Sequence, residues 1–395
     1  MNSTYNVGDE LDVEIVKIVP KGLGMAFVEG LTLFVPLAAA GDQVRVKIRE
    51  LKGKTAFAEI DAVVLASPDR IEPPCPYFGA CGGCDFQQMN YDAQLRSKIG
   101  IIRDSLERIG KIAFEQEIGM IASPKEFEYR SRAMWHLDTR QKELGYYRRN
   151  SHDVIDIAHC PQITPELNAV LETARTDLNW EGFWSERVHI EAAHGDGGHS
   201  SIFSPEIMEP TNEISFTAAG ETYFYSAQSF FQGNQFLIEQ LIEAAIGGAT
   251  GETALDLYCG VGLFALPLAR KFGKVIGVEG NDMAIDFAEK SAGHAGLQNV
   301  EFARGGVAQF LWESQLEGTD FILLDPPRAG TEKHTIRNII RVAPKHISYV
   351  SCDPTILARD LRKFVDAGYE IESITALDLF PQTHHVETVA RLRSV

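Results

Sequence analysis

Hydrophobic and polar residues alternate along the first sixty residues of the chain, as they do in strands that are buried on one face only. The clearest case is the segment 44–49, in which valine and isoleucine alternate with Arg45, Lys47 and Arg49. Glycine-containing turns interrupt the pattern at residues 21–24 and 29–30. We therefore predict a small five-stranded barrel over residues 1–62. Barrels of this kind with a basic face commonly bind single-stranded nucleic acid.

A second pattern begins at residue 231, where helix-like sequence alternates with short apolar segments. The segments that we expect to be strands are 254–257, 275–278, 321–324 and 347–350. This alternation predicts a doubly wound parallel sheet, that is, an α/β Rossmann-like domain over residues 231–395. The intervening residues 63–230 are interpreted as a central α+β domain, which a proline-rich segment separates from the barrel.

Charge modifies this picture, because the 395-residue chain has a formal net charge of -18 and phosphates are bound by Lys and Arg. Basic residues are nevertheless concentrated in segments 45–54 and 130–149, which would restrict RNA contact to one surface. The N-terminus lacks a basic and apolar leader, and no apolar run approaches the ~18 residues that span a bilayer. We expect a cytoplasmic protein without membrane contact.

Four of the six cysteines have a spacing that is typical of metal or cluster binding. Cys75, Cys81 and Cys84 lie close together, and Cys160 lies next to a proline much later in the chain. Three clustered thiolates and a distant fourth suit an iron-sulfur cluster, while four thiolates suit tetrahedral zinc equally well. Disulfides are not expected in a cytoplasmic chain. Spacing alone leaves zinc and iron-sulfur open.

Residues with the properties of a nucleotide site follow three of the predicted strands. Gly260 and Gly262 form a tight turn after the first strand, and Glu279 ends the next one, where an acid can accept hydrogen bonds from ribose hydroxyls. Dinucleotide oxidoreductases share these features. They do not require the Asp325-Pro-Pro triplet that ends a later strand, whereas methyltransferases that act on bases often carry it.

Cys352 and Glu387 are candidates for the reacting groups. Cys352 follows the strand 346–350 on the same carboxyl edge and precedes a helix, whose N-terminus favours the thiolate. Thiolate addition to carbon 6 of uracil makes carbon 5 nucleophilic, and a base must later remove the hydrogen from carbon 5. Glu387, after a proline-marked loop, supplies a carboxylate for that step.

Together, these motifs resemble those of the RNA uracil-5-methyltransferase family, over nearly the whole chain. The motifs that carry the resemblance are residues 75–84, 230–234, 256–262, 325–328, 351–354 and 385–387. The resemblance implies that Cys352 is the nucleophile and Glu387 the base. It also implies S-adenosylmethionine contacts at Gln232, Tyr258, Leu263, Glu279 and Asp325.

The same resemblance favours a 4Fe-4S cluster over zinc at Cys75, Cys81, Cys84 and Cys160. The chain departs from the family at Gly306, where the family usually has an Asp or Asn that contacts the adenine amino group. The first 62 residues look like a TRAM domain. Barrel and cluster together resemble the 23S ribosomal RNA 5-methyluridine methyltransferases, so ribosomal RNA is the expected partner and no obligate protein partner is evident.

Three alternatives remain at this point. The first is the same chemistry on a T-loop uridine of transfer RNA, since some family members with both features act there. The second is methylation of an exocyclic adenine nitrogen, although Arg328 stands where those enzymes need an aromatic residue. The third is a non-catalytic RNA-binding or assembly protein, which the acidic charge and Gly306 favour and Cys352 and Glu387 oppose.

Overall fold

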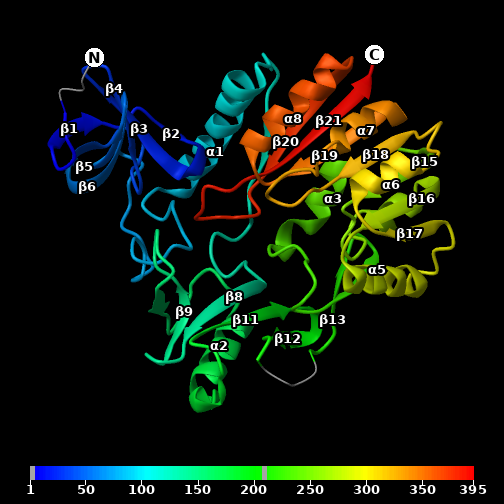
Figure 1. Cartoon of the computed structure of the whole chain (residues 1–395), viewed down its shortest axis with the longest axis horizontal. Helices are drawn as coiled ribbons and strands as arrows, with labels where there is room; N and C mark the ends of the chain where they lie inside the picture. Colours follow the sequence, from blue (N-terminus) through cyan, green and yellow to red (C-terminus); the bar gives the residue numbers. More distant parts are fainter. Residues whose placement is uncertain (1–4, 207–210) are drawn as a thin grey trace.

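The computed structural model describes residues 5–206 and 211–395, in which there are three large β-sheets and a separate two-stranded hairpin (Figure 1). A six-stranded sheet comes from the N-terminus, a five-stranded sheet from the middle of the chain, and an eight-stranded sheet mainly from the C-terminal half. No helix in the described ranges is long and apolar enough to cross a membrane.

The N-terminal sheet has the strand order β1-β5-β6-β4-β3-β2. Its strands are β1 (Glu10–Glu14), β2 (Lys17–Val19), β3 (Leu23–Val28), β4 (Leu31–Val35), β5 (Gln43–Lys52) and β6 (Thr55–Leu65). The alternation along β5 is confirmed, because Val44, Val46 and Ile48 are fully buried in the core of the sheet. The expectation of five strands is wrong by one, since the three-residue β2 pairs with β3.

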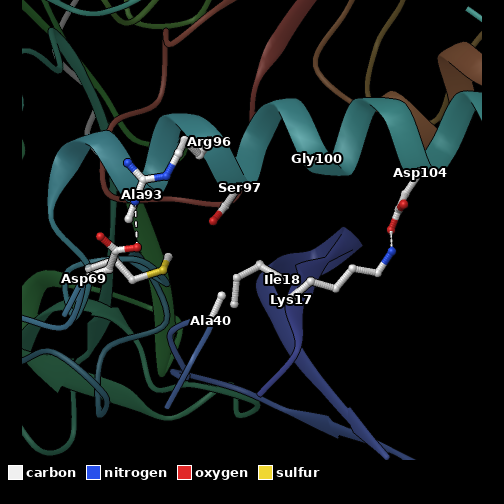
Figure 2. Close-up of a pocket in the computed structure, with 10 residues that line it drawn as sticks. Lys17, Ile18, Ala40, Asp69, Ala93, Arg96, Ser97, Gly100 and Asp104 are labelled. Carbon is white, nitrogen blue, oxygen red and sulfur yellow. Dashed lines mark hydrogen bonds and ion pairs between the residues drawn. The ribbon is translucent and has the colours of Figure 1, made fainter. Parts of the chain in front are cut away.

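Helix α1 (Tyr91–Ser105) closes one end of this core, where its Ala93 and Ile101 join the buried residues of the barrel. Asn90 caps the helix by accepting a hydrogen bond from the backbone nitrogen of Ala93. Figure 2 shows the hollow of about 210 Å³ between α1 and the barrel. Lys17 of β2 forms an ion pair with Asp104 of α1 at its edge, so the barrel is held to the helix by apolar and ionic contacts.

The central sheet is antiparallel, with the order β10-β9-β8-β11-β12. Its strands are β8 (Arg132–Asp138), β9 (Glu143–Tyr147), β10 (Val154–Asp156), β11 (Arg187–His194) and β12 (Ser200–Phe203). Helix α2 (Pro165–Asp177) covers one face, on which Trp135 and Ile190 pack against Leu167 and Leu171. The chain therefore has an α+β unit in the middle, as its mixed sequence predicts.

The C-terminal sheet has the order β17-β16-β15-β18-β19-β21-β20-β7. Its strands are β7 (Gly119–Ile121), β15 (Gly251–Leu257), β16 (Phe272–Glu279), β17 (Val300–Arg304), β18 (Phe321–Leu324), β19 (His346–Ser351), β20 (Tyr369–Leu377) and β21 (Glu387–Ser394). The four strands predicted from the apolar segments pair in parallel, which confirms that part of the prediction. β21 runs antiparallel to β19 and β20.

Helices pack on both faces of this sheet, because successive residues of the strands enter two different apolar cores. Leu323 of β18 belongs to one core, and its neighbours Ile322 and Leu324 belong to the other. The helices are α3 (Ile238–Ile246), α4 (Ala265–Ala269), α5 (Asp282–His294), α6 (Val307–Glu313), α7 (Thr335–Val342) and α8 (Pro354–Asp366).

Two segments from the range predicted as the central domain join the C-terminal unit. β7 pairs with β20 at the edge of the eight-stranded sheet. The hairpin of β13 (Ile214–Ala218) and β14 (Glu221–Tyr225) buries Tyr223 and Tyr225 in one of the two C-terminal cores. A single cut at residue 230 does not describe this arrangement, because the chain crosses between the two units more than once.

Candidate active site

A tight turn after β15 opens the carboxyl edge of the C-terminal sheet. Tyr258, Gly260 and Gly262 have φ angles of 64°, 53° and 92°, in the left-handed region that favours glycine. A Cβ atom at Gly262 would lie 2.7 Å from the side chain of Leu266, so a larger residue does not fit there. Tyr258 adopts this conformation while its hydroxyl accepts a hydrogen bond from the backbone nitrogen of Glu332 at 3.3 Å.

Glu279, at the end of β16, binds this turn through its carboxylate. Its Oε2 accepts a hydrogen bond from the backbone nitrogen of Gly260 at 3.0 Å, and its Oε1 accepts from those of Gly280 and Asn281 at 2.8 and 2.9 Å. Because a carboxylate has about four acceptor positions, capacity remains for a hydroxyl of a bound ligand. The predicted ribose acid is thus oriented before any ligand binds.

Gly306, at the N-terminus of α6, lies beside the carboxylate of Glu332. A Cβ atom on Gly306 would be 3.5 Å from Glu332 Oε2, and that oxygen accepts a hydrogen bond from the backbone nitrogen of Ala308 at 3.0 Å. Glu332, from the loop after β18, therefore occupies the space next to Gly306. No sequence pattern points to Glu332, because it lies 26 positions further along the chain.

Two more carboxylates lie on this edge with few hydrogen-bond donors. Asp256 is fully buried, and both of its side-chain oxygens lack a hydrogen bond of normal geometry within the described ranges. Burial and the nearby Asp325 raise the pKa of Asp256, and burial raises the pKa of Asp325 to about 7. Buried carboxylates without partners are unfavourable when ionised, so this edge would favour a positively charged ligand.

Cys352 and Glu387 lie at neighbouring strand ends. β19 ends at Ser351, which pairs with Thr388 of the antiparallel β21; Cys352 directly follows Ser351, and Glu387 is the first residue of β21. Asp353 then caps α8 by accepting hydrogen bonds from the backbone nitrogens of Thr355 and Ile356. Glu387 is 3% exposed, and its Oε1 has no hydrogen-bond partner in the described part of the chain.

The thiol of Cys352 is not the ready thiolate that its place before a helix predicts. Burial raises its pKa to about 12, and the charge of Glu387 adds to the rise. Arg328 opposes this shift but does not outweigh it. The expectation of a low pKa is therefore wrong for the ligand-free protein, because burial and carboxylates outweigh the helix N-terminus.

Burial also raises the pKa of Glu387, as does the charge of Asp325, and Arg328 again acts in the opposite direction. The neighbouring His385 is neutral at ordinary pH, because burial lowers its pKa to about 3. Cys352, Glu387, Asp325 and Arg328 thus interact electrostatically at one edge of the sheet. A nucleophile, an acceptor of a proton and a cation lie together there.

Comparison with known proteins decides between the enzyme classes that share such an edge. Residues 211–394 match the tRNA (Uracil-5-)-methyltransferase family, and residues 5–60 match the TRAM domain. A 23S rRNA (uracil(1939)-C(5))-methyltransferase of Pectobacterium atrosepticum is 32% identical over 420 residues, covering 96% of this chain and 93% of that protein. The chain belongs to the RNA uracil-5-methyltransferase family.

Two further relatives extend the likeness of this RNA uracil-5-methyltransferase over its whole length. An uncharacterized RNA methyltransferase of Halalkalibacterium halodurans is 33% identical, covering 98% of this chain and 97% of that protein. The crystal structure of the Pyrococcus abyssi tRNA (uracil-54, C5)-methyltransferase with S-adenosyl-L-homocysteine has a TM-score of 0.75 and 25% identity, covering 96% of this chain and 100% of that one. The C-terminal unit is accordingly a methyltransferase domain, and the barrel is a TRAM domain.

The remaining cofactor candidates of the methyltransferase lie near the hairpin β13–β14. Leu263 is buried, and its carbonyl accepts a hydrogen bond from the hydroxyl of Tyr223 at 3.2 Å. Gln232 is 4% exposed and follows Phe231, which packs in the same core as Leu263. Phe231 stacks on Tyr225 with ring centroids 4.5 Å apart, whereas Phe230 is 66% exposed.

The four cysteines of the predicted cluster lie within electrostatic reach of one another. Burial raises the pKa of the Cys75, Cys81 and Cys84 thiols, and the charge of Cys160 raises each of them further. Across the described residues, no three His, Cys, Asp or Glu side chains are spaced to hold a single metal ion. The charges of these thiols therefore act on one another, and this arrangement leaves both the zinc and the iron-sulfur alternatives open.

Ion pairs reduce the positive charge of the basic strand face on β5. Arg45 pairs with Asp12, Arg49 with Glu59, and Lys52 with Glu50. In the part of the chain that the structure describes, no ion pair involves Lys47 or Lys54. The sequence did not indicate these pairs, because Asp12 and Glu59 come from neighbouring strands.

Sequence reasoning also missed the contacts that hold the loop 378–386 before Glu387. Lys98 of α1 is fully buried and donates to Asp378 Oδ1 at 2.5 Å and to the carbonyl of Phe380 at 3.0 Å. Gln382 exchanges side-chain and backbone hydrogen bonds with Gln94 of the same helix. The sequence contains one indication of this contact. Lys98 lies on the apolar side of α1, where a buried lysine needs an acidic partner.

Proposed function

We propose that this enzyme transfers a methyl group from S-adenosylmethionine to carbon 5 of one uridine in large-subunit (23S) ribosomal RNA. The observation that carries the proposal is the position of Cys352, directly after β19 and near the start of β21 at Glu387, where the charges of Glu387, Asp325 and Arg328 act on its thiol. Choice of the ribosomal RNA rests on the relatives named as 23S rRNA methyltransferases, which match the chain from the barrel to the C-terminus. The likeness to the archaeal enzyme makes a T-loop uridine of transfer RNA the second candidate.

Cofactor binding is assigned to residues of the turn and its neighbours. Glu279 would accept hydrogen bonds from the ribose. Asp325 is a buried carboxyl whose ionised form the positive sulfur of the cofactor would stabilise. Tyr258, Leu263 and Gln232 would border the remaining part of the cofactor. Glu332 would take the role of the side chain that Gly306 lacks, because its carboxylate lies beside that glycine.

The chemistry follows from the weak nucleophilicity of carbon 5 of uracil. S-Adenosylmethionine supplies a methyl group on a positively charged sulfur. The Cys352 thiolate would add to carbon 6 to give an enolate, and carbon 5 would take the methyl group as the methyl–sulfur bond breaks and neutral S-adenosylhomocysteine leaves. Glu387 removes the hydrogen from carbon 5, the double bond between carbons 5 and 6 forms again, and the bond from carbon 6 to sulfur breaks to release the Cys352 thiolate.

Both reacting groups must ionise against their surroundings. Burial raises the pKa of the Cys352 thiol to about 12 and also raises the pKa of the Glu387 carboxyl, so burial opposes the ionised form of both groups. Arg328 favours the ionised form of each. A sulfonium at this edge would add a second positive charge, so cofactor binding would promote the thiolate.

We also propose that Cys75, Cys81, Cys84 and Cys160 hold a 4Fe-4S cluster. The thiols of Cys75, Cys81 and Cys84 are partly buried with raised pKa values, so stable thiolates there require a positively charged group, and the choice of a 4Fe-4S cluster over zinc rests on the family resemblance. Such a cluster would supply a link between the loop 75–84 and the start of α2. Protein purified without oxygen should contain iron and sulfide; zinc at one atom per chain without iron would overturn this assignment.

The test of the reaction uses two variants with opposite outcomes. Cys352→Ala should abolish methyl transfer while it retains cofactor and RNA binding. Glu387→Gln should methylate the RNA and then remain attached to it, because the amide cannot take the proton from carbon 5. A denaturing gel should show a slow-migrating protein–RNA species for Glu387→Gln only, and its absence would contradict the role of Glu387.

The RNA species is tested by tritium from labelled S-adenosylmethionine. Total RNA from cells that lack this modification is incubated with the enzyme, separated by size and digested to nucleosides. Label in 5-methyluridine from 23S RNA is the expected result. Label confined to transfer RNA would support the second candidate, and no label in 5-methyluridine would contradict the proposed reaction.

A further inference from the structure

The central sheet has one face that α2 does not cover, and half-buried rings of histidine and tyrosine lie on it. Trp135 and Leu137 of β8 point into the core with α2, so Met134 and His136 lie on the opposite face. His189 of β11 lies opposite His136 in the antiparallel register, and Tyr147 ends the neighbouring β9. Such an open antiparallel sheet with rings resembles, in its chemistry, the surfaces on which proteins stack unpaired RNA bases.

A hollow of about 320 Å³ lies at the β9 end of this face. It is lined by Gly82, Gly83, His136, Tyr146, Tyr147, Arg148 and Asn150. Arg148 is the one residue with a permanent charge among them, and none is acidic. No ion pair in the described ranges involves Arg148, which is exposed. The chain as a whole has a net charge of -18 and would repel phosphate. This hollow has an arginine and no acidic residue, so it would attract a phosphate group.

The rings of this hollow are already arranged for stacking. His136 and Tyr147 are stacked with centroids 3.7 Å apart and an interplanar angle of 12°, and His152 meets Tyr147 edge-on at 5.4 Å. Burial lowers the pKa of His136, as do the neighbouring His189 and His152. The His136 ring is therefore neutral at ordinary pH and offers a flat surface rather than a charge.

We propose that this hollow binds one unpaired nucleotide of the RNA substrate, with its base against the His136–Tyr147 ring pair and its phosphate on Arg148. The inference rests on the proposed RNA methyltransferase function and adds a second base-binding site, separate from the one that presents the target uracil to Cys352. Gly82 brings the other wall of the hollow close to β9, because a Cβ atom on Gly82 would lie 3.2 Å from the carbonyl oxygen of Tyr147.

The hollow is connected to the catalytic loop by a short series of contacts. Next to Arg148, Arg149 donates to Asp85 Oδ1 at 2.9 Å, and Asp85 Oδ2 lies 2.6 Å from His384 Nδ1. His384 is three residues before Glu387. A nucleotide bound in the hollow would therefore fix the RNA strand relative to the loop that carries the base.

The experiment measures binding of a mixed-sequence 12-nucleotide single-stranded RNA and of a duplex of equal length to the full-length protein. Tyr147→Ala should weaken binding of the single strand by about 5- to 100-fold, the range expected for loss of one stacked base, and change duplex binding little. Tyr147→Phe, which keeps the ring, should bind as the wild type does. Arg148→Ala should lower the slope of log affinity against log salt by about one phosphate contact.

Trp184→Ala is the matched control, since Trp184 is 80% exposed in the same part of the chain but does not line the hollow. Equal single-strand affinity of Tyr147→Ala and Trp184→Ala would overturn the proposal. Loss of affinity in Tyr147→Phe as well would also overturn it, because the ring would then not be the binding element. The two proposals fail in different ways. If the proposed function is wrong, the wild-type enzyme forms no 5-methyluridine. If only the second base-binding site is wrong, the wild-type enzyme still forms it.

Discussion

Asp85 and His384 are 299 residues apart in the chain, yet Asp85 Oδ2 lies 2.6 Å from His384 Nδ1. Asp85 follows a candidate cluster ligand, Cys84, and His384 belongs to the loop before Glu387. Around them, the backbone nitrogens of Asp85 and Phe86 both donate to the carbonyl of Gln382 at 3.0 Å. The cysteine loop and the loop before Glu387 are therefore one packed structure.

The first prediction concerns this contact. Asp85→Ala removes the partner of both His384 and Arg149, so the loop before Glu387 should lose its fixed position and removal of the carbon 5 hydrogen should slow by about 10- to 100-fold. Asp85→Asn keeps an oxygen acceptor and should be less affected. The measurement is the rate at which the covalent RNA adduct disappears after a single turnover.

Cofactor affinity separates this effect from general unfolding. Both Asp85 variants should bind S-adenosylhomocysteine as the wild type does, because Glu279 and the glycine turn do not contact the loop. A variant with normal adduct release would show that the contact between Asp85 and His384 does not position the base.

Features of the fold that depend on a few consecutive residues are predicted from the sequence, and features that depend on contacts between distant segments are not. The strand–turn–strand unit around Asp256 and Glu279 is read from a few consecutive residues, and its parallel pairing is confirmed. The positions of β7 and of Lys98 depend on packing between segments more than 200 residues apart, and one sequence carries no pattern for that. The buried pair of Lys98 and Asp378 belongs to the same class of long-range features.

The features of the candidate site also fall into those that the sequence predicts and those that depend on long-range contacts. Cys352 and Glu387 were predicted from motif chemistry, and the pairing of Ser351 with Thr388 brings the end of β19 next to the start of β21. The thiol pKa was predicted in the wrong direction, because the sequence indicated the helix that follows Cys352 but not its burial or the charge of Glu387. Glu332 was missed because a contact between the loop after β18 and the start of α6 has no local signature.

The second prediction follows from the raised pKa of Cys352. Since the thiol ionises only near pH 12, alkylation of Cys352 by iodoacetamide in the ligand-free enzyme should accelerate by about tenfold for each pH unit between 7 and 10. Arg328→Ala should slow the reaction, because it removes the cation that favours the thiolate. Peptide mass spectrometry that resolves Cys352 from the other five cysteines gives the rate.

The cofactor provides an internal comparison for this experiment. S-Adenosylmethionine, with a positive sulfur, should increase the fraction of thiolate, whereas S-adenosylhomocysteine, with a neutral sulfur, should not. A rate that is independent of pH from 7 to 10 would contradict the raised pKa. Equal effects of the two ligands would show that the charge of the sulfonium does not reach Cys352.

The third prediction concerns Glu332 and Gly306. Glu332→Ala should weaken S-adenosylhomocysteine binding by about 10- to 100-fold, the range for a hydrogen bond with a charged group. Adding Gly306→Asp should restore affinity, because Gly306 has a φ of -67° that any residue adopts and its Cβ would point at the space left by Glu332. Calorimetric titration measures both, and Glu332→Gln controls for loss of the cap on Ala308. Unchanged affinity in Glu332→Ala would exclude this carboxylate from the cofactor site.

The last prediction concerns the TRAM barrel, whose basic strand is only partly available for RNA. Arg49 and Lys52 form ion pairs with Glu59 and Glu50, so their charges are partly compensated before any phosphate approaches. Replacing Lys47 and Lys54 by Ala should therefore weaken RNA binding and lower the salt slope by up to about two phosphate contacts, whereas the matched replacement of Arg49 and Lys52 should do less.

Affinity measured from low to moderate salt, together with the single-turnover rate at saturating RNA, separates a role in RNA binding from a role in ordering the active site. The rate should stay near the wild-type value in both double variants, because the barrel meets α1 at Lys17 and the loop before Glu387 at Gly22, both outside the segment 47–54. An unchanged salt slope for the Lys47 and Lys54 variant would remove this strand from the RNA-binding surface, and a large fall in the rate would mean that the barrel acts through α1 and Lys98 on the loop before Glu387.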